Sequence, residues 1–286
     1  MRENVRHFCS RGGTEFRKTM NQPRCYPFDL FCSPTRERPD AVLCLTDHGG
    51  GLQVAASDLE SVLHPLEREQ AAGFGSQRRR VHYVAGRSVA KRALVRLLAS
   101  RGGEGLPSGW DRFSRIHIAN GTLGQPVLRQ PAAGGIGVSI AHDNRVAAAL
   151  AFDEAIPMAV DVEELDKKHT DMIWGWLTPR ERELMREFKN GGDMCTALWT
   201  AKEALAKVLR AGLSSLRLSV YEVERCQWRH TVLVTHFCRI PAYAAVSFLL
   251  PCTNSWCGLA LPRCVLNDDL LLQLQRGLLC SSHPTR

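Results

Sequence analysis

The amino-acid sequence predicts an α+β protein, because strands and helices occupy separate segments of the chain. Apolar residues that alternate with polar or small ones predict strands at 40–46, 137–152, 157–164 and 216–261. Apolar residues at helical spacing predict long helices at 83–100 and 194–210. Two stretches of similar order, each with strands and one long helix, therefore flank a boundary at Asp153 to Pro157.

The composition indicates a globular protein with an acidic partner. The chain has 286 residues and 44% hydrophobic content, which is ample for a core. Its net charge of +8 favours nucleic acid, anionic lipid or a phosphate-rich cofactor docked to an acidic protein, and charge alone does not choose among them. No apolar run at the N-terminus predicts a signal peptide, and none is long enough to span a bilayer.

Eleven cysteines occur without a C-x-x-C pair, and none has the spacing of a zinc site. We interpret them as reduced thiols, which favours a cytoplasmic protein. Residues 1–39 lack sustained periodicity and are expected to form a poorly ordered extension.

The first half, 40–156, begins with the strand at 40–46 and continues with a helix predicted at 59–74. A basic run at Arg78 to Arg80 leads into the helix that ends near Ser100. On that helix Arg87 and Lys91 are one turn apart and expected on the exposed side. A basic run is usually a solvated surface, although arginine is also well suited to bind phosphate.

Short strands or turns are expected at 116–119 and 124–128, followed by a hairpin of 137–141 with 145–152. His142 ends the first strand of that hairpin. A histidine at such a position is commonly satisfied by local contacts.

The second half, 157–262, opens with a strand that carries two acids. Alternation buries Met158, Val160 and Val162 and directs Asp161 and Glu163 to the other face. Alternate residues on a strand are about 7 Å apart, so both carboxylates could reach one hard cation. The alternative is an edge strand whose acids are solvated.

The helix predicted at 194–210 has Asp193 as a candidate cap and Gly212 just beyond its end. Trp199, Glu203 and Lys207 recur at every fourth position and form one stripe on it. On the helix alone, Glu203 and Lys207 could be a surface pair worth about 0.2–0.5 kcal/mol.

A capping box at Thr178 to Glu181, with proline at the first helical position, predicts a helix to about Lys189. Antiparallel strands are then expected at 216–224, 230–238, 242–250 and 256–261. Residues 263–286 are expected to be a tail of unknown role.

The strand acids and the helix stripe together resemble the 4'-phosphopantetheinyl transferases of the surfactin-synthetase type. That family has acid, apolar, acid on a strand, which corresponds to Asp161-Val162-Glu163 here. Its helix reads aromatic, small hydroxyl, any residue, Lys-Glu, three residues, Lys, which corresponds to Trp199 through Lys207. The segment Ser139 to His142 adds to the likeness, which runs from about Leu66 to Ala260.

The resemblance implies two similar α+β halves related by a pseudo-twofold, with coenzyme A in a cleft between them. It implies magnesium bound by Asp161, Glu163 and Glu203. Glu203 would also accept the serine proton, directly or through water, and Lys207 would steady the pyrophosphate and the leaving phosphate. The implied reaction transfers 4'-phosphopantetheine from coenzyme A to a serine of an acyl, peptidyl or aryl carrier protein and releases adenosine 3',5'-bisphosphate.

For the coenzyme A phosphates, the resemblance points to Arg80, Arg87 and His142. Two positions depart from the family pattern: Gln125 replaces a common lysine, and Ala141 replaces the serine that commonly precedes the histidine. Each departure removes one expected contact to coenzyme A.

Two other functions are weighed against this one. The charge and the run Arg78 to Arg80 would suit a nucleic-acid-binding module, but no recognised motif is present and only 7% of residues are aromatic, which weakens a stacking surface. An inactive coenzyme A-binding relative would not need all three acids and Lys207. We therefore expect an enzyme that is a cytoplasmic monomer, with neither nucleic acid nor membrane as partner.

Overall fold

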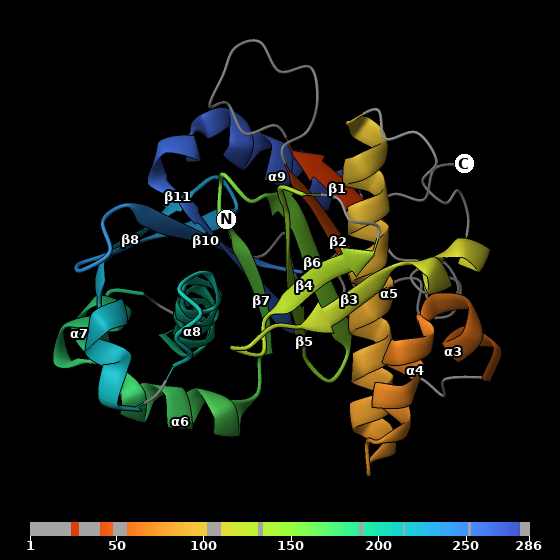
Figure 1. Cartoon of the computed structure of the whole chain (residues 1–286). Helices are drawn as coiled ribbons and strands as arrows, with labels where there is room; N and C mark the ends of the chain where they lie inside the picture. Colours follow the sequence, from red (N-terminus) through yellow and green to blue (C-terminus); the bar gives the residue numbers. More distant parts are fainter. Residues whose placement is uncertain are drawn as a thin grey trace, which may run out of the picture.

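A computed structural model describes most of the chain and shows mixed helices and antiparallel sheets, as expected (Figure 1). The described residues are 24–28, 41–47, 56–101, 110–130, 134–188, 191–213, 215–250 and 253–280.

The first sheet is antiparallel and has the strand order β1-β2-β6-β5. Its strands are β1 Arg24–Phe28, β2 Ala41–Asp47, β6 Val146–Asp153 and β5 Ile136–His142. Helix α5, Gln77–Ser100, is the long helix that runs along one face of this sheet (Figure 1). The hydroxyl of Ser76 accepts a hydrogen bond from the Arg79 amide at 3.1 Å, and this N-cap explains where α5 begins.

The second sheet has the order β7-β11-β10-β9-β8, again antiparallel throughout. Its strands are β7 Ala159–Glu164, β11 Ser255–Pro262, β10 Tyr243–Leu249, β9 Val232–Phe237 and β8 Val223–Arg229. Helix α8, Gly191–Val208, covers one face together with α6, Lys167–Trp176, and α7, Pro179–Arg186. Asp193 lies in the first turn of α8, because the helix starts two residues before it.

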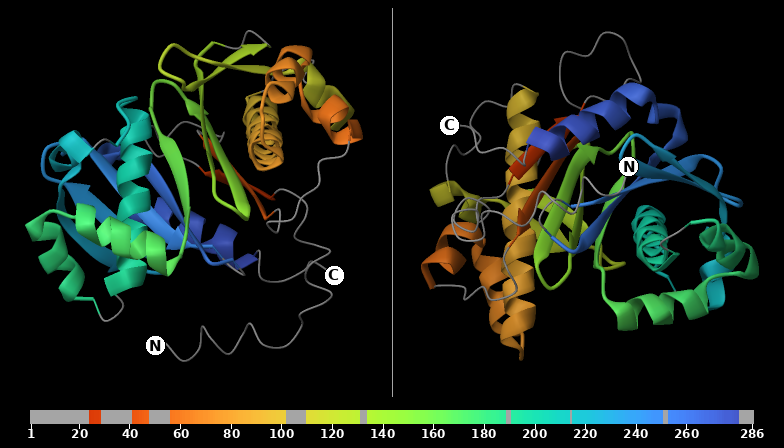
Figure 2. Two further views of the ribbon diagram at one scale, coloured as in Figure 1. Left: turned by 90° about the horizontal axis from the view of Figure 1, so that it is seen from below. Right: turned by 180° about the vertical axis from the view of Figure 1, so that it is seen from behind.

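The two sheets pack against each other through their remaining faces, so that α5 and α8 lie on opposite sides of the molecule (Figure 2). Between them is a core of aliphatic residues from both sheets and from helix α9, Asp268–Cys280. The layers are therefore helix, sheet, sheet, helix. Each long helix contributes its apolar residues to a separate core cluster with its own sheet.

Strands β5 and β7 lie next to each other where the sheets meet. The Val160 amide donates to the hydroxyl of Ser139 at 3.1 Å, which links the two strands through a buried side chain. In the turn between β5 and β6, Asn144 donates to Glu164 at 2.8 Å. Asp143 of the same turn accepts a hydrogen bond from Ser255 at 2.5 Å. These contacts fix one edge of the first half against the start of the second.

The helix predicted at 59–74 is divided into α3, Ala56–Val62, and α4, Pro65–Ala72. Pro65 cannot continue a helix, and His64 instead caps α4. The small hairpin β3, His117–Asn120, with β4, Pro126–Gln130, confirms the short strands predicted there.

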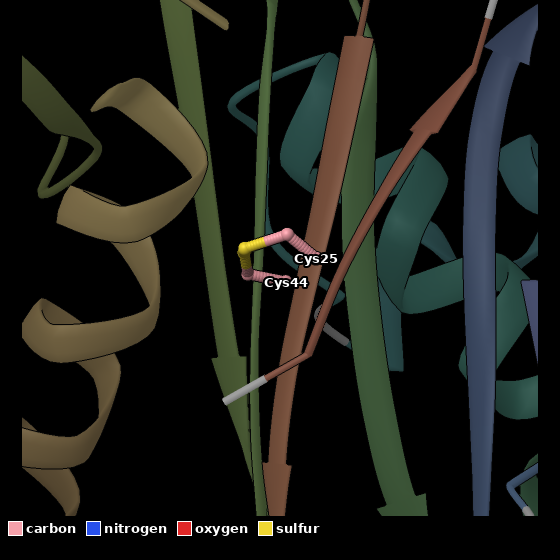
Figure 3. The surroundings of a disulfide bond; sticks show 2 residues. All are labelled: Cys25 and Cys44. Atoms are coloured by element: carbon pink, nitrogen blue, oxygen red, sulfur yellow. A yellow bond between two sulfur atoms is a disulfide. The ribbon is translucent and has the colours of Figure 1, made fainter. Parts of the chain in front are cut away.

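Strand β1 corrects the expectation of a poorly ordered extension for residues 24–28, and the rest of that extension lies outside the described residues. Cys25 and Cys44 face each other across β1 and β2 and form a disulfide (Figure 3). The interpretation of all cysteines as reduced thiols is thus wrong for this pair. Their partnership depends on strand pairing, which the sequence did not reveal. Among the other described cysteines, the free ones are Cys195, Cys226, Cys238, Cys257 and Cys264.

Two predictions in the last third also need correction. The predicted strand at 216–224 is a 3-10 helix, Ser215–Tyr221, and the strand begins only at Val223. The presumed tail contains α9, whose Leu270, Leu271 and Leu274 are buried in the core between the sheets. Within the described ranges, no helix is long and apolar enough to cross a membrane.

Candidate active site

Lys207, on helix α8, lies where the two sheets meet and contacts both. Its Nζ donates to Asp161 Oδ1 at 2.7 Å and to the carbonyl oxygens of Val160 at 3.1 Å and Ile140 at 3.3 Å. Because Ile140 belongs to β5 and Val160 to β7, one ammonium joins the helix to a strand from each half. The Lys207 side chain keeps 32% of its surface exposed, so a bound anion could still reach it.

Asp161, on β7, is the most enclosed acid of the site, with 6% of its surface exposed. Burial raises the pKa of Asp161, while the Lys207 ammonium favours the ionised form. Its Oδ1 is held by Lys207, but the buried Oδ2 has no hydrogen-bond partner among the described residues. A buried carboxylate oxygen without a partner is costly, which makes Oδ2 a candidate ligand atom.

Glu163 lies two residues after Asp161 on strand β7, and Glu203 lies on helix α8. Burial, followed by repulsion from Asp161 and Glu203, raises the pKa of Glu163 to about 8. Burial and then repulsion from Asp161 raise the pKa of Glu203 to about 7. The structure therefore brings together the three acids selected from the sequence and places them within electrostatic reach of one another.

The donor set fits a hard divalent cation. Carboxylate oxygens are the ligands that magnesium prefers, and mutual repulsion among three acids favours a bound cation. Within the described part of the chain, no group of three or more His, Cys, Asp or Glu side chains is arranged so that it could hold a metal ion, so the acids would have to move closer together to bind one. Of the three acids, Asp161 is the one that forms an ion pair with Lys207.

One further side chain at this site was missed by sequence analysis. His169, on α6, has its Nδ1 3.7 Å from Glu163 Oε2. It lies only six residues after Glu163, but the intervening turn into α6 gave no signal that the two side chains would meet.

Helix α8 approaches the sheet closely at this site because β11 carries a glycine there. Gly258 pairs with Asp161 across β11 and β7. A Cβ on Gly258 would lie 2.9 Å from the backbone oxygen of Thr200 on α8, closer than normal packing allows. Trp199 is 6% exposed and packs against Trp176 with ring centroids 4.9 Å apart, so it anchors the helix in the core.

Arg87 and Lys91 are not on the exposed side of α5, which corrects the prediction. Lys91 is completely buried and Arg87 is 6% exposed. Both contact Glu67 of α4, with Lys91 Nζ at 2.5 Å from Oε2 and Arg87 Nε at 3.5 Å from Oε1. Arg87 also donates to Asn120 Oδ1 at 3.2 Å. Helical spacing places the two residues on one face, but it does not say that a buried acid from another helix covers that face.

The basic run Arg78 to Arg80 is held by neighbouring groups. Arg78 donates to Asn144, and Arg79 lies over the Phe74 ring at 5.1 Å. Arg80 donates to the backbone oxygens of Ala71 and Phe74 at 3.3 and 3.4 Å, near the end of α4. Arg78 and Arg79 are exposed, whereas Arg80 is half-buried.

His142 is exposed at the end of β5, two residues after Ile140. Its ring lies 4.6 Å from that of His82 on α5. Gln125 turns back on its own hairpin, where its Oε1 accepts a hydrogen bond from the Leu123 amide at 3.0 Å. His142 therefore lies against α5, the helix that carries Arg80 and Arg87, and is two residues along β5 from the Ile140 carbonyl that Lys207 contacts.

Part of the second half of the chain matches a known protein family. Residues 157–254 match the family model of the 4'-phosphopantetheinyl transferase superfamily. The matched segment contains Asp161, Glu163, Glu203 and Lys207. The match supports a transferase of this general superfamily. No curated protein matches the chain.

Proposed function

We propose that the protein transfers the 4'-phosphopantetheine group of coenzyme A to a serine of an acyl, peptidyl or aryl carrier protein. Adenosine 3',5'-bisphosphate is the other product. The observation that carries this proposal is the Asp161–Lys207 ion pair, which sets a lysine beside three mutually repelling acids. The family match over 157–254 supports the reaction class. The motif from Trp199 to Lys207 favours the surfactin-synthetase-activating type.

Asp161, Glu163 and Glu203 are the residues that would hold magnesium. The unpartnered Oδ2 of Asp161 supports this assignment, because a cation would satisfy it. When bound, magnesium would supply positive charge that offsets the charge developing on the pyrophosphate.

Glu203 is the proposed proton acceptor for the carrier serine, directly or through water. Without metal, burial followed by repulsion from Asp161 raises the pKa of Glu203 to about 7, and a bound cation would favour the carboxylate form that accepts a proton. Lys207 would donate to the pyrophosphate and to the leaving phosphate. Its remaining exposure and its fixed position between β5 and β7 support that role.

We further propose that the halves 40–156 and 157–262 are related by a pseudo-twofold and hold coenzyme A between them. Each half has a sheet with one long helix on its outer face, which supports such a relation. His142, which is exposed at the end of β5, would meet the nucleotide phosphates. Arg80 and Arg87 would contribute positive charge from α5, with Arg87 oriented by Glu67.

The carrier proteins of this family are acidic helical modules, and a net charge of +8 would speed their encounter with this chain. The direct test is to incubate the protein with coenzyme A, magnesium and a panel of carrier proteins, and then to weigh the carriers. At least one carrier should gain the mass of phosphopantetheine with magnesium and not with a chelator. A folded protein that modifies no carrier of a broad panel would contradict the proposal.

A further inference from the structure

Among the residues that the structure describes, two ion pairs are completely enclosed, one in each half. Lys91 with Glu67 and Lys202 with Glu181 each have a nitrogen–oxygen distance of 2.5 Å and at most 1% side-chain exposure. Burying charge carries a desolvation cost that often cancels the attraction within the pair. Such pairs therefore contribute more to the placement of the elements they join than to net stability.

In the second half, the pair joins three elements through one carboxylate. Glu181 is the third residue of α7, and its Oε2 accepts from the Thr178 amide at 3.0 Å to complete the capping box. Its Oε1 accepts from the amide of Val223, the first residue of β8, at 2.9 Å, and also contacts Lys202 Nζ of α8. The start of α7, the edge strand and the site helix thus share one carboxylate.

The first half repeats this arrangement. Glu67 is the third residue of α4, and its Oε2 accepts from the His64 amide at 3.0 Å. Its Oε1 accepts from the Ile118 amide of β3 at 2.9 Å, and Lys91 of α5 supplies the cation. Both helices also begin with proline at the first position. The same capping box with a buried lysine therefore ties the long helix of each half to its neighbours.

Lys202 immediately precedes Glu203. Successive residues on a helix differ in direction by about 100°, so the direction in which Lys202 is held fixes the direction of Glu203. Lys202 points toward α7 and β8, and Glu203 is directed toward Asp161 on β7. Because Lys202 has no exposed surface, it cannot contact a substrate in this conformation.

We propose that Glu181 and Lys202 are positioning residues, which fix the rotation of α8 and thereby hold Glu203 and Lys207 against Asp161. This inference rests on the proposed function, because it assigns the pair a role in the same site. In the Lys202-Glu203 doublet, the glutamate would then act at the reacting groups and the lysine would orient it.

Variants that remove the charges singly and together test this role. Lys202→Met keeps an unbranched side chain of high helix propensity and leaves Glu181 as an unpaired buried acid. Glu181→Gln in the same chain removes that charge while a glutamine can still complete the capping box. The double variant Glu181→Gln/Lys202→Met removes both charges and keeps the side-chain size, although the single amide oxygen of glutamine can accept from only one of the Thr178 and Val223 amides.

We expect Lys202→Met to lower kcat by about 10-fold to 100-fold, because small displacements of catalytic groups have effects of this size. KM for coenzyme A should rise by a smaller factor than kcat falls, since Arg80, Arg87 and His142 lie outside α8 and only Lys207 moves with it. The double variant should recover kcat to within about threefold of wild type, because no buried charge is left unpaired. Recovery without a lysine at 202 would be impossible if that ammonium contacted the substrate.

The role is wrong if a folded double variant is as slow as Lys202→Met, or if Lys202→Met alone keeps the wild-type kcat. If Lys202→Met does not fold, the double variant is compared with the wild type alone, and a folded double variant more than about 10-fold slower than wild type would overturn the role. Lys91→Met is the matched comparison, since it opens an equally buried pair. It should act mainly by raising KM for coenzyme A through Glu67 and Arg87.

Hydrogen exchange of residues 199–208 separates failure of this inference from failure of the proposed function. If the wild-type protein transfers nothing to any carrier, the proposed function fails and the pair is judged by exchange alone. Faster exchange in Lys202→Met and wild-type exchange in the double variant would support the positioning role. Unchanged exchange in Lys202→Met would overturn it.

Discussion

Four ionisable side chains lie where α8 packs against β7, and the acids among them outnumber the bases. Asp161, Glu163 and Glu203 supply three acids, whereas Lys207 supplies one ammonium. Burial raises the pKa of each acid because a low-dielectric site disfavours charge. At this scale the site is incomplete until further positive charge arrives, which is the property expected of a magnesium site.

The role of Glu203 can be tested with the isosteric change Glu203→Gln. Stability should barely change, because the two residues have similar size and helix propensity. Transfer to the carrier should be at least about 100-fold slower at saturating magnesium, since loss of a general base typically costs about 100-fold to 10,000-fold. A variant within a few-fold of wild type would move the assignment of the base to a metal-bound water or to another acid, with Glu164 next.

The raised pKa values also predict how stability depends on pH without metal. In the folded protein Glu163 and Glu203 keep protons up to about pH 8 and 7, whereas 4.5 is the ordinary value for a glutamate. The unfolded chain therefore loses these protons first, and the stability they contribute falls as pH rises through that window. The melting temperature in a chelator should be lower near pH 9 than near pH 5, to an extent that Glu203→Gln reduces.

Magnesium provides the control for the pH experiment. It should raise the melting temperature more at the alkaline end, where the acids are ionised and can bind it. An equal fall in Glu203→Gln and wild type would show that other groups cause the pH dependence.

At the scale of elements, the close contact between α8 and β11 depends on Gly258. Gly258→Ala would place a methyl group 2.9 Å from the Thr200 backbone oxygen, so helix and sheet must separate. We expect a loss of about 1–3 kcal/mol in the free energy of unfolding, the usual cost of overpacking. Activity should fall as well, because Gly258 is paired with Asp161.

Gly175→Ala is the matched control for that substitution. Gly175 lies in α6, and a Cβ there would meet no atom within 4 Å. Alanine should be neutral or stabilising at this helical position. If denaturant unfolding gave equal stabilities for Gly258→Ala and Gly175→Ala, the close approach of α8 would not matter.

The coenzyme A residues on α5 and β5 allow a separate prediction. If Arg87 and His142 hold the nucleotide phosphates, neutral replacements should raise KM for coenzyme A. With dephospho-coenzyme A, which lacks the 3'-phosphate, KM should then differ less between variant and wild type. Equal losses with both cofactors would place these side chains away from the 3'-phosphate. Arg87→Lys is a useful partner variant, since it keeps the charge but not the planar fork.

Sequence patterns predicted the elements whose signals are local. The alternation around Asp161 and the capping box at Thr178 both appear as expected, because each depends on neighbours within a few residues. The burial of Arg87 and Lys91 did not follow from the sequence, since it depends on Glu67 from a separate helix. The Cys25–Cys44 bridge was missed for the same reason, because it required the pairing of β1 with β2.

For the candidate site, spacing selected three acids that lie within electrostatic reach of one another, but not the residues that support them. Glu181 was recognised as a cap and Lys202 as part of a motif, yet nothing in the chain between them shows that they meet. A proline stands two residues before both Glu67 and Glu181. This repeated pattern could have indicated that the two halves share one capping arrangement.

At the scale of the whole molecule, the site lies where the halves meet, and each contributes to it. Lys207 bonds to Ile140 of the first sheet and to Asp161 of the second, so displacement of one half would open the site. The layers of helix, sheet, sheet and helix leave the two long helices on opposite sides, as Figure 2 shows. An active enzyme therefore requires both halves in register.

The most direct measurement follows both products of one reaction. Wild-type protein would be mixed with coenzyme A, magnesium and a carrier protein, and the modified carrier and the released adenosine 3',5'-bisphosphate would be quantified together. Phosphopantetheine transfer predicts equal amounts of the two, with the added mass on a single serine and none formed without magnesium. Release of the nucleotide without a modified carrier, or a folded protein that yields neither product with any carrier tested, would contradict the proposed activity.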